Sequence, residues 1–365
     1  MKKTMQYFAV LACAGMLALT TAPRGMADDD SPLRPLGNSR FIAAVPFPGY
    51  PEGIVVKDGR IYVSGPAAFG VPGNFVPSTI HVYDEWSGAF LRDITIQGQP
   101  ANGLHALSCI AADDDGNLYV LDEQLGVVKV NVVTGRQSIY AGPFYPVFHS
   151  AYNPPAPLLL NDLAFDKKGY LYITDSFQAT IWRVPPGGGA PQPWYTSSKI
   201  DGPFGPNGIR IDAKSQKMYF DLTFDAANLG HVYTLPLVDH PTDSDLKLFH
   251  SYTAGAGPDG VAFGQSGNLY VCLAGYSQIS VLRPDETEVQ RFSGPAQRPA
   301  NQGGPLAWAN PANISFNNLT GTLLVTNHAS MTGLPDPSPL FAIFDVYVND
   351  RAGTLFAPGQ DQNEQ

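Results

Sequence analysis

The 365-residue chain carries a formal net charge of −10, and this excess of carboxylates argues against nucleic-acid binding because phosphates would be repelled. Its 37 glycines and 33 prolines favour many short strands and turns, and its three cysteines exclude a disulfide-rich scaffold. We therefore expect an all-β protein with one sizeable hydrophobic core and no nucleic-acid partner.

The first 27 residues have the three parts of a secretory signal peptide. The basic pair Lys2-Lys3 precedes an apolar run around residues 8–19, and Gly25-Met26-Ala27 places small residues where signal peptidase reads. The run is shorter than the roughly 20 residues that cross a membrane, and the sequence before Cys13 is a poor lipoprotein signal. Cleavage after residue 27 would leave residues 28–365 as one exported domain, periplasmic or secreted, with a formal charge of −13 and no membrane partner.

One hairpin unit recurs six times along the remaining chain. Each copy has a key residue, a short apolar strand, a polar turn that usually contains Gly, and a second apolar strand that usually carries Tyr. The copies read EGIVVKDGRIYVSG, SCIAADDDGNLYVLD, NDLAFDKKGYLYITD, NGIRIDAKSQKMYFD, DGVAFGQSGNLYVCL and ANISFNNLTGTLLVTN, and they begin at residues 52, 108, 161, 207, 259 and 312. Because the starts lie 46 to 56 residues apart and further strand-like pieces separate the hairpins, the pattern predicts a β-propeller of six four-stranded blades around a channel.

The two ends of the repeated region are expected to complete the ring. SRFIAAVPFPG, before the first copy, and AIFDVYVND and TLFAP, after the last, can supply strands that share one blade. A sandwich of unrelated strands would not explain why one hairpin recurs in register. We therefore expect residues 28–365 to form a single propeller domain with little helix.

The key residues of the six copies form a column, which reads Glu52, Ser108, Asn161, Asn207, Asp259 and Ala312. Since the innermost strand of each blade lines the channel, these positions should ring one mouth. Two carboxylates and two amide oxygens at one point match a hard divalent cation, above all Ca²⁺, whose charge would offset the burial of the acids. The column has no His or Cys, which argues against zinc. The alternative is that its Asn-Gly and Asp-Gly pairs are turn formers.

Four motifs carry a resemblance to a known family: Pro51-Glu52-Gly53, Asn161-Asp162, Pro206-Asn207-Gly208-Ile209 and Pro258-Asp259-Gly260-Val261. In this order and spacing they resemble the gluconolactonase and senescence-marker-protein (regucalcin-like) family over about residues 40–350. The order Glu, Asn, Asn, Asp is shared with paraoxonases and diisopropylfluorophosphatase, all six-bladed calcium-dependent hydrolases. The resemblance implies that Glu52, Asn161, Asn207 and Asp259 hold one catalytic Ca²⁺. It also implies that Asp259 or a metal-bound water acts as base or nucleophile.

The sequence departs from this family at a position that bears on the substrate. Gluconolactonases of the family carry an Arg two residues before the blade-three Asn, whereas this chain has Leu159. The loops PFPGYPEG, GPFYPVFHSAYNPPAP and DGPFGPNG, which feed the same mouth, are aromatic and rich in Pro. We therefore expect Ser108, Leu159, His105 and Phe204 to contact a small-molecule substrate, a lactone or related ester more hydrophobic than a sugar acid lactone.

The histidines and cysteines lead to two further expectations. Paraoxonases use a His pair near their calcium, so the resemblance makes His328, in VTNHAS, a candidate catalytic residue, with a structural role as the alternative. Cys109 and Cys272 fall in blades two and five, farther apart than the ~7 Å limit for a disulfide, so both should be free.

Two other functions are compatible with a propeller. The ring of oxygens could be a structural calcium site beneath a surface that binds a peptide or polymer. The scaffold could also carry out a condensation, as in strictosidine-synthase-like proteins, but the intact column argues against this. The leading hypothesis is an exported calcium-dependent hydrolase of lactones or related esters.

Overall fold

The computed structural model describes residues 34–68, 70–294 and 307–358, and the signal peptide expected at residues 1–27 lies outside them. The chain divides into two units, Met1–Arg34 and Pro35–Gln365, and all strands of the described residues belong to the second. None of the helical pieces among the described residues is long and apolar enough to cross a membrane.

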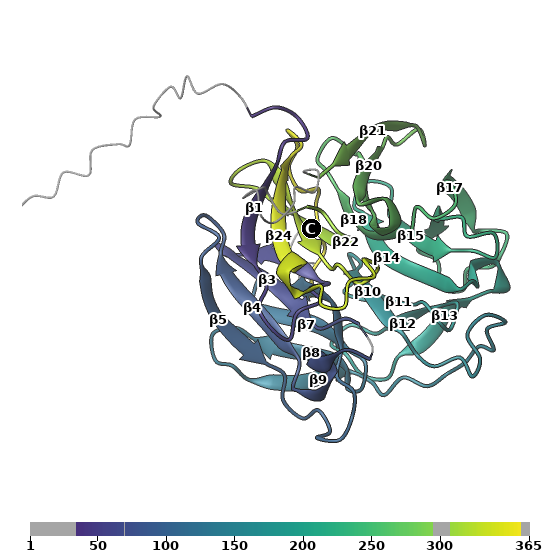
Figure 1. The fold of residues 1–365 in the computed structure, drawn as a ribbon. Coiled ribbons are helices and arrows are strands. Elements are labelled where there is room, and N and C mark those ends of the chain that lie inside the picture. The colour runs from purple at the N-terminus through teal and green to yellow at the C-terminus, as the bar shows by residue number, and fades with distance from the viewer. Residues whose placement is uncertain (1–33, 69, 295–306, 359–365) are drawn as a thin grey trace, which may run out of the picture. The chain divides into compact units, whose positions relative to one another are not determined.

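The described residues form six antiparallel sheets of four strands, which confirms the six-bladed propeller (Figure 1). Blade 1 holds β2 (Ile54–Lys57), β3 (Arg60–Gly65), β4 (Thr79–Asp84) and β5 (Phe90–Thr95), and blade 2 holds β6 (Leu107–Ala112), β7 (Asn117–Asp122), β8 (Gly126–Asn131) and β9 (Gln137–Ala141). Blade 3 holds β10 (Leu160–Phe165), β11 (Leu171–Asp175), β12 (Thr180–Val184) and β13 (Gln192–Thr196), and blade 4 holds β14 (Phe204–Asp212), β15 (Lys217–Phe224), β16 (His231–Pro236) and β17 (Lys247–Ser251). Blade 5 holds β18 (Pro258–Phe263), β19 (Leu269–Leu273), β20 (Gln278–Leu282) and β21 (Glu288–Ser293).

Blade 6 joins the two ends of the described chain. It holds β22 (Pro311–Asn317), β23 (Thr322–Asn327) and β24 (Ala342–Tyr347), and its outer strand is β1 (Ser39–Ala44). The purple β1 and the yellow β24 lie side by side in Figure 1, and Ser39 pairs with Val346. Two of the three terminal segments expected to close the ring therefore do so.

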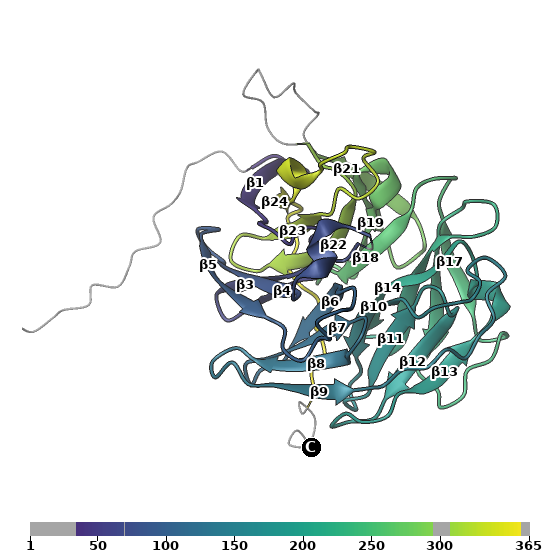
Figure 2. The ribbon, with the colours of Figure 1, turned by 60° about the horizontal axis from the view of Figure 1, so that its bottom comes forward.

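The third segment, TLFAP at residues 354–358, forms no strand of this blade. Phe356 makes an isolated bridge to Phe165 in β10, and Ala352 makes one to Gly264 after β18 (Figure 2). These contacts, with a cavity of about 260 Å³ bordered by Arg210 and Phe356, lie past the column positions on the innermost strands. The C-terminal segment thus crosses the far end of the channel instead of extending a sheet.

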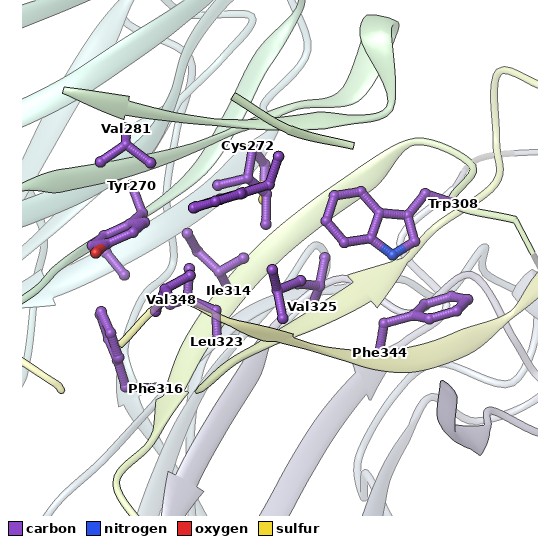
Figure 3. Packing of buried hydrophobic residues seen from close by; sticks show 14 of the residues in the cluster. Tyr270, Cys272, Val281, Trp308, Ile314, Phe316, Leu323, Val325, Phe344 and Val348 are labelled. Carbon is purple, nitrogen blue, oxygen red and sulfur yellow. The ribbon is translucent and has the colours of Figure 1, made fainter. Parts of the chain in front are cut away.

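Packing between neighbouring blades forms the core. Each of the six blade interfaces has its own cluster of buried apolar side chains. Figure 3 shows the one between blades 5 and 6, where Tyr270 and Cys272 meet Ile314, Val325 and Phe344. Successive side chains along a strand point to opposite faces of its sheet, so each blade buries apolar side chains against both neighbours. The blades therefore stabilise one another through the hydrophobic effect.

Helix is confined, in the described part of the chain, to four short 3-10 turns. These are η1 (Pro72–Phe75), η2 (Ser198–Ile200), η3 (Ala274–Tyr276) and η5 (Ser338–Leu340).

Candidate active site

Each column residue lies at an interruption of strand pairing. In blades 2 to 6 the register between the first and second strands shifts across the column position, as between Leu107 and Ile110 in β6. In blade 1, β2 begins at Ile54, so Glu52 precedes the paired region. Bulges of this kind re-aim side chains and are common beside active sites. The irregularity explains how residues on a sheet strand can turn toward the channel.

The glycines after three column residues allow neighbouring strands to approach each other. Gly53, Gly208 and Gly260 are absent from the positions with positive φ, so they do not serve as turn glycines. A Cβ on Gly208 would lie 2.3 Å from the carbonyl oxygen of Asp259, and one on Gly260 would lie 2.6 Å from that of Ala312. The alternative that these Asn-Gly and Asp-Gly pairs are turn formers is therefore wrong, because close backbone contact with the next blade requires the glycine.

Buried hydroxyl groups hold the column carbonyls in place. Thr326 Oγ1 accepts a hydrogen bond from Asn313 N (2.9 Å) and donates to the carbonyl of Glu52 in the next blade (2.8 Å). Thr174 Oγ1 links Asp162 N and the Asn207 carbonyl in the same way. Ser64 Oγ repeats the pattern between Gly53 N and the Ser108 carbonyl. Each hydroxyl satisfies a donor and an acceptor that the bulge leaves without a ladder partner.

A cavity of about 270 Å³ opens above the column. Eight of the nine residues assigned from the sequence line it: Glu52, Ser108, Leu159, Asn161, Phe204, Asn207, Asp259 and His328. His105 does not line it, and its main-chain N–H and C=O are both hydrogen-bonded to Asn74. The structure therefore brings the two acids and two amides together at one pocket.

Two amide oxygens of the column have no hydrogen-bond donor. Asn161 donates its Nδ2 to Ser176 Oγ (3.2 Å), and Asn207 donates its Nδ2 to Thr223 Oγ1 (3.0 Å). The Oδ1 atom of each is buried and unpaired. Because unpaired buried acceptors are costly, this arrangement fits a group that accepts lone pairs from oxygen.

The two column carboxyls lie in the same low-dielectric site. Burial, followed by the charge of Asp259, raises the pKa of Glu52 well above its ordinary value, and burial raises the pKa of Asp259. The described residues contain no cluster of three or more His, Cys, Asp or Glu arranged for a metal ion. Two acids and two unpaired amide oxygens nevertheless fit a hard cation, which takes carboxylate and amide oxygens as ligands and would supply the missing positive charge.

His328 stands beside Glu52. Its Nε2 is buried without a hydrogen-bond partner and lies 3.7 Å from Glu52 Oε2, while its Nδ1 is 2.7 Å from Ser330 Oγ. Burial lowers the pKa of His328 to about 4. The imidazole is therefore neutral near pH 7, with one ring nitrogen directed at the site.

Two buried polar contacts join residues that follow column positions on the innermost strands. Arg210 Nη1 forms a buried ion pair with Asp162 Oδ2 at 2.7 Å. Asn313 Nδ2 donates to Cys109 Sγ at 2.8 Å. Cys109 and Cys272 are both free, which confirms the expectation drawn from their blades.

The pocket wall is mainly apolar, and its charged side chains are acids. Half of the lining residues are aromatic or aliphatic, among them Leu160, Phe177, Phe224 and Met331, and apolar atoms supply most of the pocket surface. No Lys or Arg lines it in the described part of the chain, whereas a third acid, Glu123, does. Glu123 lies outside the predicted column because it follows the second strand of its hairpin, and the alignment of that strand across the six copies contains the signal for it.

The sequence matches one family model, and the fold matches several solved structures. The model of the family described as SMP-30/Gluconolactonase/LRE-like region matches residues 80–303. A search of the curated proteins finds no match.

Solved structures share the fold at low sequence identity. A calcium-binding protein, regucalcin, from Agrobacterium tumefaciens aligns with a TM-score of 0.62 and 17% identity, covering 88% of this chain and 96% of the other. A gluconolactonase from Xanthomonas campestris gives 0.56 and 14%, with 86% and 90% covered. Virginiamycin B lyase from Staphylococcus aureus gives 0.50 and 15%, with 80% and 81% covered.

The lyase shows that this architecture carries more than one chemistry, so the fold alone does not fix the reaction. The family match covers more than half of the chain and includes Ser108, Asn161, Asn207 and Asp259. The protein belongs to the SMP-30/gluconolactonase/LRE-like family of six-bladed β-propellers.

Proposed function

We propose that this protein is a calcium-dependent hydrolase of lactones or related esters. The observation that carries the proposal is the meeting of two acids, Glu52 and Asp259, with the unpaired amide oxygens of Asn161 and Asn207 at one pocket. The family match and the likeness to a gluconolactonase and to a calcium-binding regucalcin support it. Glu52, Asn161, Asn207 and Asp259 would hold one Ca²⁺, with other divalent cations as alternatives.

The cation, when bound, would polarise the substrate carbonyl and stabilise negative charge on its oxygen. Asp259 has two roles open to it. As a base it takes a proton from the water that attacks the carbonyl carbon; as a nucleophile it attacks that carbon itself, and water later cleaves the acyl group from it. In both routes the ester C–O bond breaks and the leaving oxygen gains a proton.

His328 is suited to move that proton. Its neutral imidazole has an unpaired Nε2 that faces the site, and its contact with Ser330 fixes the ring orientation. We propose that Nε2 accepts a proton from water or returns one to the leaving oxygen.

The shape and polarity of the pocket support a hydrophobic substrate. Phe177 and Phe204 pack edge to face with ring centroids 5.7 Å apart, and both line the pocket near Leu159. Two further aromatic side chains outside the pocket lining, Phe75 between β3 and β4 and Tyr145 between β9 and β10, are exposed. An apolar acyl chain or ring substituent would lose water against these walls, so it should bind better than a polyhydroxylated sugar lactone.

The export expected from the first 27 residues also stays a proposal. Expression of the whole chain in a bacterial host should give a mature protein that begins at Asp28. Amino-terminal sequencing of the processed protein checks this, and a product that retains residues 1–27 would contradict it.

A panel of lactones tests the function. Purified protein should hydrolyse apolar γ- and δ-lactones faster than gluconolactone, and a chelator should abolish turnover until Ca²⁺ is restored. Metal analysis of protein prepared in calcium should find one ion per chain, and chelation should lower the melting temperature because the ion binds the native state. Bound calcium without turnover of any ester would favour a binding propeller with a structural ion.

A further inference from the structure

Glu123 is the first residue after β7, in the turn that leads to β8. Asp122 Oδ1 accepts hydrogen bonds from the main-chain N–H groups of Gln124 and Leu125 at 2.9 Å each. Glu123 donates its own N–H to the carbonyl of Ala106. The turn is therefore held at both sides, and a fixed main chain presents the Glu123 side chain to the pocket that it lines.

This position recurs in other blades, where its side chain serves the site. In blade 2, Leu107, which precedes the column residue Ser108, pairs with Asp122, which precedes Glu123. The same register identifies the counterparts of Glu123 as Ser176 in blade 3, Thr223 in blade 4 and His328 in blade 6. Ser176 and Thr223 accept the amide hydrogens of Asn161 and Asn207. In blades 3 and 4 the position therefore orients a column residue.

Blade 2 does not use Glu123 in that way. Its column residue, Ser108, donates its hydroxyl to the main-chain carbonyl of Leu160 at 2.6 Å. The Glu123 carboxyl instead receives the N–H of Leu160, which lowers its pKa, although burial and the charge of Asp175 outweigh this and raise the pKa well above its ordinary value. Glu123 therefore does not orient the column residue of its own blade, whereas Ser176 and Thr223 do so in theirs.

The surroundings of Glu123 leave acceptor capacity unused. A carboxyl group keeps free lone pairs on its carbonyl oxygen whether it is ionised or protonated, and the protein supplies one main-chain donor here. The pocket wall also holds apolar residues, among them Ala106, Leu159 and Phe177, and the described pocket lining offers no Lys or Arg. Because an unsatisfied acceptor is unfavourable in such a wall, a donor on the bound molecule would gain affinity there.

Glu123 is also set apart from the two column acids. The charges that raise the pKa of Glu52 are those of Asp259 and Asp162, whereas those that act on Glu123 are Asp175 and Asp122. The cation proposed for the column needs no ligand from blade 2, whose column residue is a serine bonded to main chain. Glu123 therefore lines the same pocket from blade 2, which supplies no ligand to the proposed metal site.

We infer that Glu123 is a specificity-determining residue that accepts a hydrogen bond from an O–H or N–H group on the substrate. For the reaction this rests on the proposed function; the addition is the substrate class, an apolar lactone or ester that carries one hydrogen-bond donor.

Matched substrates and variants test this. The substrates are alkyl γ- and δ-lactones with one hydroxyl at successive chain positions, each compared with its deoxy parent. For the best isomer the unmodified protein should favour the hydroxylated member by about ten- to a hundred-fold in kcat/KM. Glu123→Leu should bring that ratio near one, because the hydroxylated member loses much more kcat/KM than the deoxy member. Glu123→Gln keeps an acceptor oxygen and should retain part of the preference.

Three controls separate this inference from its alternatives. Gln124→Leu changes the exposed neighbour in the same turn and should leave the preference intact. Calorimetric calcium affinity should not change in Glu123→Leu, and a large loss would make Glu123 a metal ligand and overturn the inference. Hydroxylated and deoxy alkyl cyclopentanones, which keep the carbonyl but have no ester bond, report binding directly.

The outcomes distinguish the two proposals. If lactones turn over but the preference is absent, or survives in Glu123→Leu, Glu123 does not select the substrate. If no ester is hydrolysed yet the cyclopentanone preference depends on Glu123, the donor-binding role stands and the hydrolase proposal fails. Equal binding of both cyclopentanones to the parent protein and to Glu123→Leu would overturn the inference without any turnover.

Discussion

The Nε2 atom of His328 lies 3.7 Å from Oε2 of Glu52, so the histidine that lines the pocket stands beside one of the two column acids. The two residues come from opposite ends of the sequence. They meet because blade 6 is the neighbour of blade 1, and the Thr326 hydroxyl that bonds the Glu52 carbonyl fixes the spacing between these blades.

Replacing His328 should affect the chemical step more than the fold. His328→Gln keeps a polar group of similar reach but cannot exchange a proton near neutral pH, so kcat should fall by about two orders of magnitude or more. Steady-state kinetics on an apolar lactone, with calcium affinity measured in parallel, checks this. Ser330→Ala, which removes the partner of Nδ1, should have a smaller effect. An unchanged kcat in His328→Gln would assign the histidine a structural role.

The two column acids should respond differently to neutralisation. Asp259→Asn keeps an oxygen ligand but removes the base or nucleophile, and hydrolysis should fall by about two to four orders of magnitude with the fold retained. Glu52→Gln should act through metal affinity, so added calcium should recover part of its activity. The comparison is kcat at rising calcium concentration for both variants.

Ser108→Ala is the matched control for that comparison, because Ser108 holds the same column position but bonds to the Leu160 carbonyl. It should change kcat little. Near-normal turnover in Asp259→Asn would make the ring a structural site beneath a binding surface.

The hydroxyls that bridge neighbouring blades should be worth measurable stability. Thr326→Val removes both hydrogen bonds and leaves Asn313 N and the Glu52 carbonyl without partners, so the free energy of unfolding should fall by about 1–3 kcal/mol. Thr326→Ser keeps the hydroxyl and should restore most of the loss. Urea denaturation of both variants measures the difference.

Asp221 provides a converse case in blade 4. It holds the register position of Thr326 and Thr174 but is fully buried, and among the described residues the main-chain N–H of Gly208 is the one donor that its carboxyl meets. Asp221→Thr should therefore stabilise the protein, since a hydroxyl can join Gly208 N to the Asp259 carbonyl as in blades 3 and 6. Destabilisation by this change would show that the carboxyl has a further partner in solution.

Asp175 should give stability a specific pH dependence. Burial raises its pKa from an ordinary value of 3.8 to about 6, although Leu159 N and Trp182 Nε1 donate to it. Because the folded state holds the proton more tightly than the unfolded state, this contribution is full below pH 4 and is lost as the pH rises through 6. The loss amounts to about 3 kcal/mol.

The variant Asp175→Asn isolates the contribution of Asp175 to the pH dependence of the unfolding free energy. The unfolding free energy of the unmodified protein minus that of the variant should fall by about 3 kcal/mol between pH 4 and pH 7, measured by urea denaturation at each pH. A difference that does not vary with pH would mean that Asp175 titrates normally in the folded state.

The repeat explains why the fold and the column could be predicted. Each hairpin copy places its key residue at one level of the channel, so Glu52, Asn161, Asn207 and Asp259 had to meet once six copies closed into a ring. The apolar lining was also visible, because Leu159 stands where the family carries Arg. These features depend on position within the repeat, which a sequence displays directly.

The features that were missed depend on contacts between repeats. Glu123 belongs to the second strand, and its freedom follows from Ser108 bonding to blade 3. His105 looked well placed near a strand end, but loop contacts with Asn74 keep it out of the pocket. The C-terminal segment around residues 352–358 is strand-like in composition, but it bridges Phe165 in β10 and Gly264 after β18. It does not join blade 6, because β1 already forms the outer strand of that sheet.

The pairing of β1 with β24 closes the ring, and it is the contact most directly loaded when the two ends of blade 6 are pulled apart. Ser39 begins β1 and faces Val346 near the end of β24, so a force applied to both ends would pull on the same edge of this strand pair. The hydrogen bonds between antiparallel strands would then be loaded one after another instead of together. Under such a load β1 would detach from β24 by the sequential rupture of hydrogen bonds. The blade interfaces would remain intact, because each has its own cluster of apolar side chains.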